Sequence, residues 1–193
     1  MILPKPAGEC LLNHDSFITI KKQKNKQMKK ILILLLITGL FNGLTACAQR
    51  PSPAAKASQT TTSGVKITID YSSPGIKGRT IGKEIAPWGQ VWRTGANEAT
   101  VFEVSKNVTI AGKTLPKGKY SLYSIPGQKE WVIMLNKTWN QSGTEYDKKA
   151  DALRFTVKTL KAPAFSERMT FKIAKTGVVS LIWGDYMVNF LVK

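Results

Sequence analysis

The sequence predicts an all-β domain, an antiparallel β-sandwich or jelly roll, and three observations lead to this fold class. Short segments alternate apolar and polar residues, as residues 65–71 do, which is typical of a strand with one buried face. Gly and Pro turns separate these segments at short intervals. After residue 64 no apolar pattern of helical length occurs. About nine strands in roughly 125 residues are enough for one such domain.

The part before this domain carries the marks of export. Met28-Lys29-Lys30 precedes an apolar run, residues 31–37, and the stretch closes with Leu44-Thr45-Ala46-Cys47. A positive start, a short apolar run and small residues at a cleavage site predict a signal peptide over residues 28–46. Its last four residues resemble the bacterial lipobox, which makes Cys47 the lipidated first residue of the mature chain and its membrane anchor. An uncleaved anchor helix or a buried free cysteine is the alternative.

Two further segments flank the signal peptide. Residues 1–27 show neither helical nor strand periodicity and include the basic run 21–26. We interpret them as a misannotated or disordered leader in front of a true start at Met28, with a long basic signal region as the alternative. Residues 47–64 are rich in Pro, Ser, Thr and Ala, a composition that buries no core. They are predicted to be a flexible tether between membrane and domain.

The folded domain is predicted to span residues 65–193. Residues 72–75 end the first strand, and residues 76–87, which have glycines between short apolar points, are expected to form a loop with one helical turn. Residues 137–152 have no period and read as a second long loop. The predicted strands are 65–71, 99–104, two short pieces within 107–115, 119–125, 130–136, 151–158, 168–173, 178–183 and 186–192, the last two forming a hairpin that turns at Gly184-Asp185.

The charge of the chain favours anionic partners without indicating a nucleic-acid site. The full chain has a formal charge of +17, and residues 47–193 keep 22 Lys and Arg against 10 Asp and Glu, or +12. A basic field attracts acidic surfaces such as lipid head groups or acidic glycans. The lysines are spread along the chain rather than clustered with aromatic residues, so we predict no nucleic-acid partner.

The positions of cysteine and histidine exclude several enzyme classes. The two cysteines are Cys10 and Cys47 and the single histidine is His14, so the predicted domain contains neither residue type. Without them it has no Ser-His-Asp triad, Cys-His dyad or histidine zinc site. The aspartates do not follow the spacing of an EF-hand calcium loop. We therefore predict no metal and no other cofactor.

The densest group of ligand-binding side chains lies in residues 88–98. Guanidinium, amide and carboxylate groups beside aromatic rings are typical of sites that grip polar ligands, and Trp88 and Trp92 have the spacing to stack on sugar rings, with Trp139 or Tyr146 as an opposite wall. In the structural interpretation these groups fill the core and bond the backbone of their own loop. The candidate ligand-binding residues are Arg79, Trp88, Trp92, Arg93, Thr94, Asn97 and Glu98.

Glu98 is also the best candidate for catalysis. Most glycoside hydrolases need two carboxyl groups roughly 5 to 9.5 Å apart, and Glu98 lies beside Asn97 and near Arg93. The sequence does not indicate its partner. An Arg-carboxylate pair that organises the loop is the competing interpretation.

Several of these residues also carry a family resemblance. Arg79, the string Trp92-Arg93-Thr94-Gly95-Ala96-Asn97-Glu98 and residues 115–122 and 125–127 resemble a family catalogued as domain of unknown function 2911, which is abundant in Bacteroidetes and often carried on lipoproteins. Trp131 and Trp183-Gly184 also suit its pattern. The resemblance implies a compact β-rich envelope domain from about residue 67 onward, and it implies no activity.

Together these observations predict a lipid-anchored domain that faces the periplasm. Its expected role is non-catalytic binding of a glycan or other polar ligand, or a structural role in the envelope. The alternative is a carboxylate-dependent, glycan-active hydrolase centred on Glu98. A third interpretation, assembly with other envelope proteins, predicts an exposed apolar patch instead of a pocket.

Overall fold

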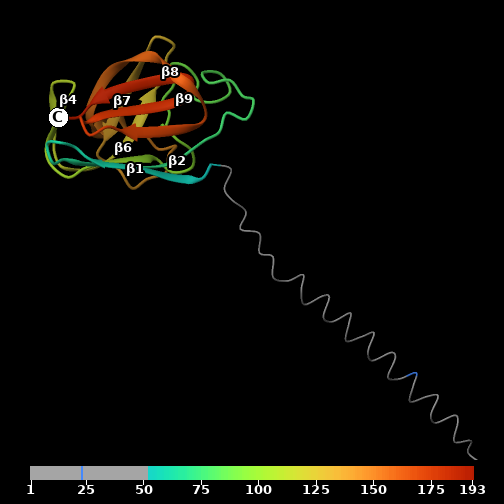
Figure 1. Ribbon diagram of the computed structural model, residues 1–193, viewed down its shortest axis with the longest axis horizontal. Helices are drawn as coiled ribbons and strands as arrows, with labels where there is room; N and C mark the ends of the chain where they lie inside the picture. The colour runs from blue at the N-terminus through green and yellow to red at the C-terminus, as the bar shows by residue number, and fades with distance from the viewer. Residues whose placement is uncertain (1–22, 24–51) are drawn as a thin grey trace, which may run out of the picture. The chain divides into compact units, whose positions relative to one another are not determined.

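Nine β-strands and a short 3-10 helix form the domain in the computed structural model, which describes residue 23 and residues 52–193 (Figure 1). The predicted signal peptide and Cys47 lie outside the described residues. The same is true of the predicted leader, with the exception of residue 23. No described helix is long and apolar enough to cross a membrane. The elements are β1 (Ala54–Thr60), β2 (Lys66–Ser72), β3 (Thr100–Val104), β4 (Val108–Ile110), β5 (Lys113–Leu115), β6 (Gly118–Ile125), β7 (Glu130–Asn136), η2 (Lys148–Ala150), β8 (Asp151–Ile173) and β9 (Val178–Leu191).

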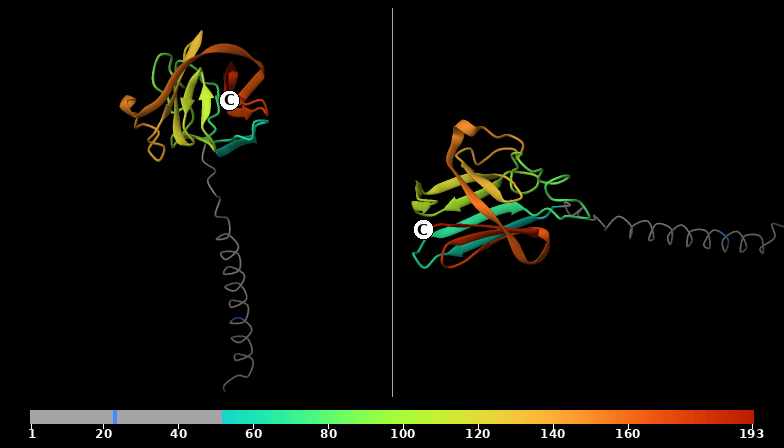
Figure 2. Two further views of the ribbon diagram at one scale, coloured as in Figure 1. Left: turned by 90° about the vertical axis from the view of Figure 1, so that its left-hand side faces the viewer. Right: turned by 90° about the horizontal axis from the view of Figure 1, so that it is seen from above.

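Seven of the strands form one antiparallel sheet in the order β1-β2-β3-β6-β7-β8-β9, and β4 and β5 form a separate hairpin. The sheet curls, and β8 crosses from one layer of strands to the other (Figure 2). Its first part pairs with β7 as far as Lys158, and from Thr159 onward it pairs with β9. The predicted all-β antiparallel fold class is confirmed.

The curl is closed by the irregular segment that follows β2. Gly75 forms an antiparallel bridge with Arg168 of β8. On either side of it, the Met169 amide donates to the Pro74 carbonyl at 3.0 Å and the Ile76 amide donates to the Glu167 carbonyl at 3.0 Å. These bonds hold the far end of β8 against the end of β2, which are distant in sequence.

The main core lies inside the curl and is made by the alternating faces of the strands. Ile67 and Ile69 of β2 and Phe102 of β3 are completely buried, as the strict alternation predicts. A second, smaller cluster, Ala99, Tyr123 and Met134, lies apart from the main core and is covered in part by Tyr146 of the loop between β7 and β8. That loop is therefore packed on the domain rather than free of it.

The prediction of a flexible tether over residues 47–64 is wrong for residues 54–60, which form β1. All seven residues of β1 pair with β2, from Ala54 opposite Ser72 to Thr60 opposite Lys66. The composition of this segment does not indicate a strand, because its residues are small or polar and none of its side chains is fully buried. Its stability comes from backbone pairing to a strand that has its own buried face. Residues 47–51 lie outside the part that the structure describes.

Two predicted breaks in the C-terminal half are also absent. The segments predicted as separate strands, 151–158 and 168–173, belong to the single strand β8, and the predicted turn at Gly184-Asp185 lies inside β9. The turn signals mark irregular pairing instead, because the β8–β9 register shifts between Lys161 and Ser166 and again before Thr170. Gly184 has φ +58, and a Cβ there would lie only 3.1 Å from the Cδ1 of Ile81.

The pairing of β1 predicts a distinct pattern of amide hydrogen exchange. As an edge strand, β1 directs every second amide toward β2 and leaves the others facing solvent. Within residues 54–60, alternate amides should exchange slowly and their neighbours fast, as read by NMR. Uniformly fast exchange across the segment would show that it behaves as a tether.

Candidate functional site

The predicted ligand segment, residues 88–98, connects β2 to β3 in the sequence and runs over the edge of the core. Trp92 exchanges two backbone hydrogen bonds with Ser124 of β6, at 2.7 Å and 2.8 Å. Further along, the Ala96 amide donates to the Ser72 carbonyl at 3.1 Å. A Cβ on Gly95 would lie 2.7 Å from the Thr100 hydroxyl oxygen, so only glycine fits this passage. The segment is irregular in shape but fixed to two strands.

The tryptophans of this segment belong to the packing of the domain. Trp92 stacks on Trp183 with ring centroids 5.3 Å apart and meets the edge of Trp131 at 6.1 Å. Trp88 packs edge-on against Tyr186 at 5.5 Å and lies so close to Gly82 that a Cβ there would clash with its ring. One face of the Trp92 ring is covered by Trp183, and both tryptophans are only partly exposed.

Three polar members of the predicted site bond to the chain itself. Arg79 donates from Nε to the Ile76 carbonyl at 3.1 Å and from Nη2 to the Gly75 carbonyl at 2.8 Å. Thr94 is fully buried and donates to the Ser124 hydroxyl at 2.9 Å. Asn97 donates from Nδ2 to the Ser52 carbonyl at 3.3 Å. These three side chains contact other parts of the chain, as described by the structural interpretation, in which they hold their own loop in place.

Arg93 and Glu98 both reach the long loop between β7 and β8. Arg93 lies against Gly143, where a Cβ would be 2.1 Å from the Arg93 Cδ. Its Nε is buried and has no hydrogen-bond partner within the described chain. Glu98 forms an antiparallel bridge with Ser142. The structure thus brings these two residues together with the loop that the sequence suggested as an opposite wall. Trp139 lies elsewhere on that loop, under the ammonium group of Lys119 at 4.9 Å.

Two tyrosines fasten this loop to the sheet. The Tyr123 hydroxyl accepts from Gln141 Nε2 at 2.9 Å and donates to the Glu145 carbonyl at 2.5 Å. The Tyr146 hydroxyl donates to the Asp151 carboxylate at 2.7 Å. Burial and the bond to Asp151 raise the pKa of Tyr146 to about 12. Burial also raises the pKa of Tyr123. Both hydroxyls are therefore protonated at neutral pH and act as hydrogen-bond donors that hold the loop down.

The carboxylate of Glu98 shares a shallow cavity with a second acidic residue. Glu98 and Asp70 line a space of about 260 Å³ beside β1, together with Tyr71 and Ser72. Asp70 is already paired, because its carboxylate lies 2.8 Å from the Lys56 ammonium. Glu98 is exposed and Asp70 is half-buried, so the two acidic residues are not enclosed as most catalytic carboxylate pairs are.

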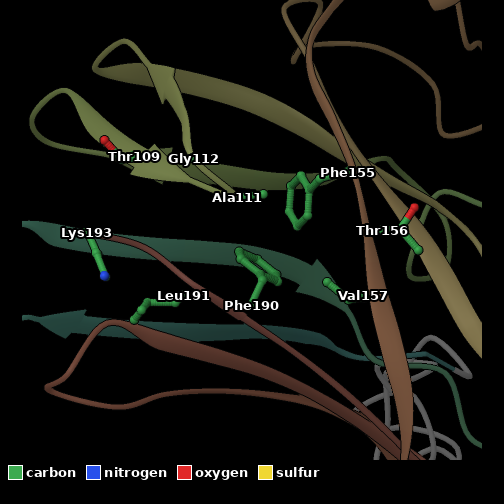
Figure 3. Close-up of a pocket in the computed structure, with 9 residues that line it drawn as sticks. All are labelled: Thr109, Ala111, Gly112, Phe155, Thr156, Val157, Phe190, Leu191 and Lys193. Atoms are coloured by element: carbon green, nitrogen blue, oxygen red, sulfur yellow. The ribbon is translucent and has the colours of Figure 1, made fainter.

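A different cavity, of about 360 Å³, lies between the β4–β5 turn, β8 and the end of β9 (Figure 3). The rings of Phe155 and Phe190 meet edge to face at 5.5 Å and form its apolar floor. In Figure 3 the side chains of Lys193 and Leu191 both lie to the left of the two phenylalanine rings. The lining residues are Thr109, Ala111, Gly112, Phe155, Thr156, Val157, Phe190, Leu191 and Lys193.

Sequence reasoning missed this cavity because its walls come from three distant parts of the chain. Phe155 and Phe190 look like ordinary inward positions of alternating strands. One local signal was available, the Ala111-Gly112 turn, where both residues have positive φ. A Cβ on Gly112 would meet nothing within 4 Å. The turn therefore borders open space, but only the fold shows that Phe155 and Phe190 line the same space.

In the part of the chain that the structure describes, no group of three or more His, Cys, Asp or Glu side chains is placed to hold an ion. The fold and these two of its cavities define a small all-β domain with recesses on its surface.

The chain belongs to the family described as protein of unknown function (DUF2911), whose model matches residues 52–192. The match begins before β1 and includes it, as the sheet requires. A search of curated proteins returned no match, and a search of solved structures also returned none.

The stacking of Trp92 predicts a structural role that mutation can measure. Replacing Trp92 by Ala removes its contacts with Trp183 and Trp131 and should lower the free energy of unfolding by about 3 kcal/mol. The neighbouring Val91, 44% exposed, supplies the control, since Val91→Ala should change it by less than about 0.5 kcal/mol. Urea unfolding measures both. Equal midpoints for Trp92→Ala and the wild type would return Trp92 to the list of ligand-binding residues.

Proposed function

We propose that this chain is a lipid-anchored module of the cell envelope that binds a small amphipathic ligand without converting it. The observation that carries the proposal is the cavity floored by Phe155 and Phe190. Its size falls within the range of small-molecule sites, roughly 300 to 1,000 Å³, and such sites are mostly apolar with a few polar groups.

The lining specifies the chemistry of the ligand. Phe155, Val157, Phe190 and Leu191 offer apolar surface for an alkyl chain or a ring. Lys193 is exposed at the rim and supplies a cation for a carboxylate or phosphate. The best-fitting ligand is therefore an apolar group of moderate size that ends in an anion. This proposed ligand differs from the glycan or other polar ligand that the sequence led us to expect at residues 88–98.

The proposed location rests on the export signals in the sequence. The lipobox-like Leu44-Thr45-Ala46-Cys47 supports a membrane anchor, and the chain after Cys47 lacks an acidic run of the kind associated with surface export, which favours the periplasmic side. The positive charge of residues 47–193 suits a position beside anionic lipid head groups.

A polar ligand at residues 88–98 has weaker support. Trp92 has one ring face covered by Trp183, Thr94 is buried, and Arg79 spends two donors on backbone carbonyls. What this segment offers an incoming sugar is the partly exposed edge of Trp88 and the side chains of Asn97 and Glu98.

Hydrolysis centred on Glu98 is the rival function, and one observation favours it. Glu98 and Asp70 line the same cavity, which is the arrangement that a two-carboxylate mechanism needs. We expect Glu98→Gln to leave any activity on envelope glycans unchanged. A loss of at least about a hundredfold in this variant, matched by Asp70→Asn and without loss of stability, would establish the enzyme instead.

Filling the cavity should abolish binding without unfolding the domain. Thr109 is an exposed lining residue of the cavity on β4, and a tryptophan there would add a large ring at the cavity wall. With dansyl-undecanoic acid as the probe, Thr109→Trp should reduce affinity at least about tenfold, because the apolar surface is no longer available. Fluorescence titration measures the change.

Two further variants make this test specific. Thr60→Trp places the same side chain on an exposed position of β1, outside the cavity, and should bind the probe like the wild type. Lys193→Gln should weaken the acid roughly two- to fivefold, the effect of a partly exposed ion pair, and leave the corresponding dansyl alcohol unaffected. Equal loss of both probes in Thr60→Trp and Thr109→Trp would refute the cavity as the binding site.

A further inference from the structure

We infer that the end of the domain that carries Phe165 rests on the surface of an anionic membrane. This inference rests on the proposed lipid anchor at Cys47 and adds an orientation to it. Three observations carry it: the short reach from Cys47 to the first strand, an exposed aromatic at the same end of the domain, and the charges around that aromatic.

The first observation is the length of chain between the anchor and the domain. Because β1 begins at Ala54, the segment available as a tether is far shorter than residues 47–64. The Pro53 carbonyl already accepts the Ser73 amide at 2.8 Å. Cys47 precedes Pro53 by six positions, which span at most roughly 20 Å when fully extended. A domain of this size is roughly 35 to 40 Å across, so the anchor keeps the Pro53 end near the bilayer.

The second observation is the position of Phe165. At 60% exposure it is the most exposed large hydrophobic side chain in the described part of the chain. It projects where β8 changes register between Lys161 and Ser166, beside Pro163, which has no amide to donate to a neighbouring strand. Ala162 is buried, at 6% exposure, whereas the three residues that follow it are exposed.

Hydrogen bonds place Phe165 at the same end of the domain as Pro53. Ser73, which bonds Pro53, also donates from its hydroxyl to the Met169 carbonyl at 2.7 Å. The Ser73 carbonyl accepts from Arg168 Nη1 at 3.1 Å. Arg168 lies three positions after Phe165 on β8. Ser73 therefore joins the start of β1 to Arg168 and Met169, which follow Phe165 by three and four positions on β8.

The third observation is the charge around Phe165. Lys77, whose amide donates to the Glu167 carboxylate at 2.8 Å, lies beside this part of β8. Arg79 follows two positions later, with its guanidinium bonded to neutral carbonyls. Arg168 adds a third exposed cation, and the exposed acidic residues of this region include Glu167 and Asp185, which follows Gly184, the pairing partner of Ser166. An exposed apolar wedge among cations is typical of surfaces that insert into the interface of an anionic bilayer.

The test places a polarity-sensitive dye at Phe165 in the full, lipidated chain. In the matured protein the thiol of Cys47 carries the lipid and Cys10 has been removed, so Phe165→Cys supplies the single free thiol for labelling with a nitrobenzoxadiazole dye. Thr114→Cys, exposed on β5, is the matched control at the opposite end of β2 and β3. Both proteins are reconstituted into vesicles of phosphatidylcholine mixed with phosphatidylglycerol.

We expect the dye at position 165 to shift its emission to the blue, to be quenched by nitroxide lipids and to be shielded from iodide, while the dye at 114 stays aqueous. Lys77→Glu should reduce the shift at 165 on the mixed vesicles, whereas Lys113→Glu, on β5, should leave it unchanged. In pure phosphatidylcholine the shift should be smaller.

Two results overturn the inference and can be told apart. If the chain floats with the vesicles but the dye at 165 remains as aqueous as the dye at 114, the anchor holds and the orientation is wrong; a contact with another protein then becomes the better account of Phe165. If mass spectrometry shows no lipid on Cys47, both the proposed anchor and the orientation built on it fail.

Discussion

The backbone hydrogen bonds along β8 are the constraint on which this structure depends. One strand of 23 residues pairs first with β7, then with β9, and its end also pairs with residues 74–76 behind β2. Because a strand offers bonds on two edges, this third pairing closes the curled sheet around one core. The bend that allows β8 to serve both layers also exposes Phe165. A single geometric requirement thus produces both the closure of the domain and its most exposed aromatic residue.

The segment richest in apparent binding groups is used mainly for structure. Residues 73–98 belong to no regular strand of the sheet, so their backbone groups must find other partners. Arg79 satisfies two carbonyls, Thr94 joins the segment to β6, and Trp92 fills the edge of the core. Aromatic and guanidinium groups are effective in this role for the reasons that make them effective in ligand sites: they combine a large apolar surface with directed hydrogen bonds.

The two proposed surfaces lie at opposite ends of β2. The last residue of β2, Ser72, is followed by Ser73, which contacts the Phe165 end of the domain. Its first residue, Lys66, forms hydrogen bonds with Ser105, which lies just before the β4–β5 hairpin that lines the cavity. If the Phe165 end rests on the membrane as proposed, the β4–β5 side of the cavity lies toward the end of β2 that is remote from it.

The sequence by itself determined the fold class, the family and most strands, because alternation of apolar residues and Gly or Pro turns are local properties of the chain. Residues 65–71, 130–136 and the Ala111-Gly112 turn were readable for that reason. Only the tertiary structure decided that residues 54–60 are a strand and that β8 continues through Pro163, since both depend on hydrogen bonds to distant partners. The same holds for the sites. Side chains that cluster in sequence at residues 88–98 were easy to notice, whereas Phe155 and Phe190 form a cavity only after β8 and β9 are brought together.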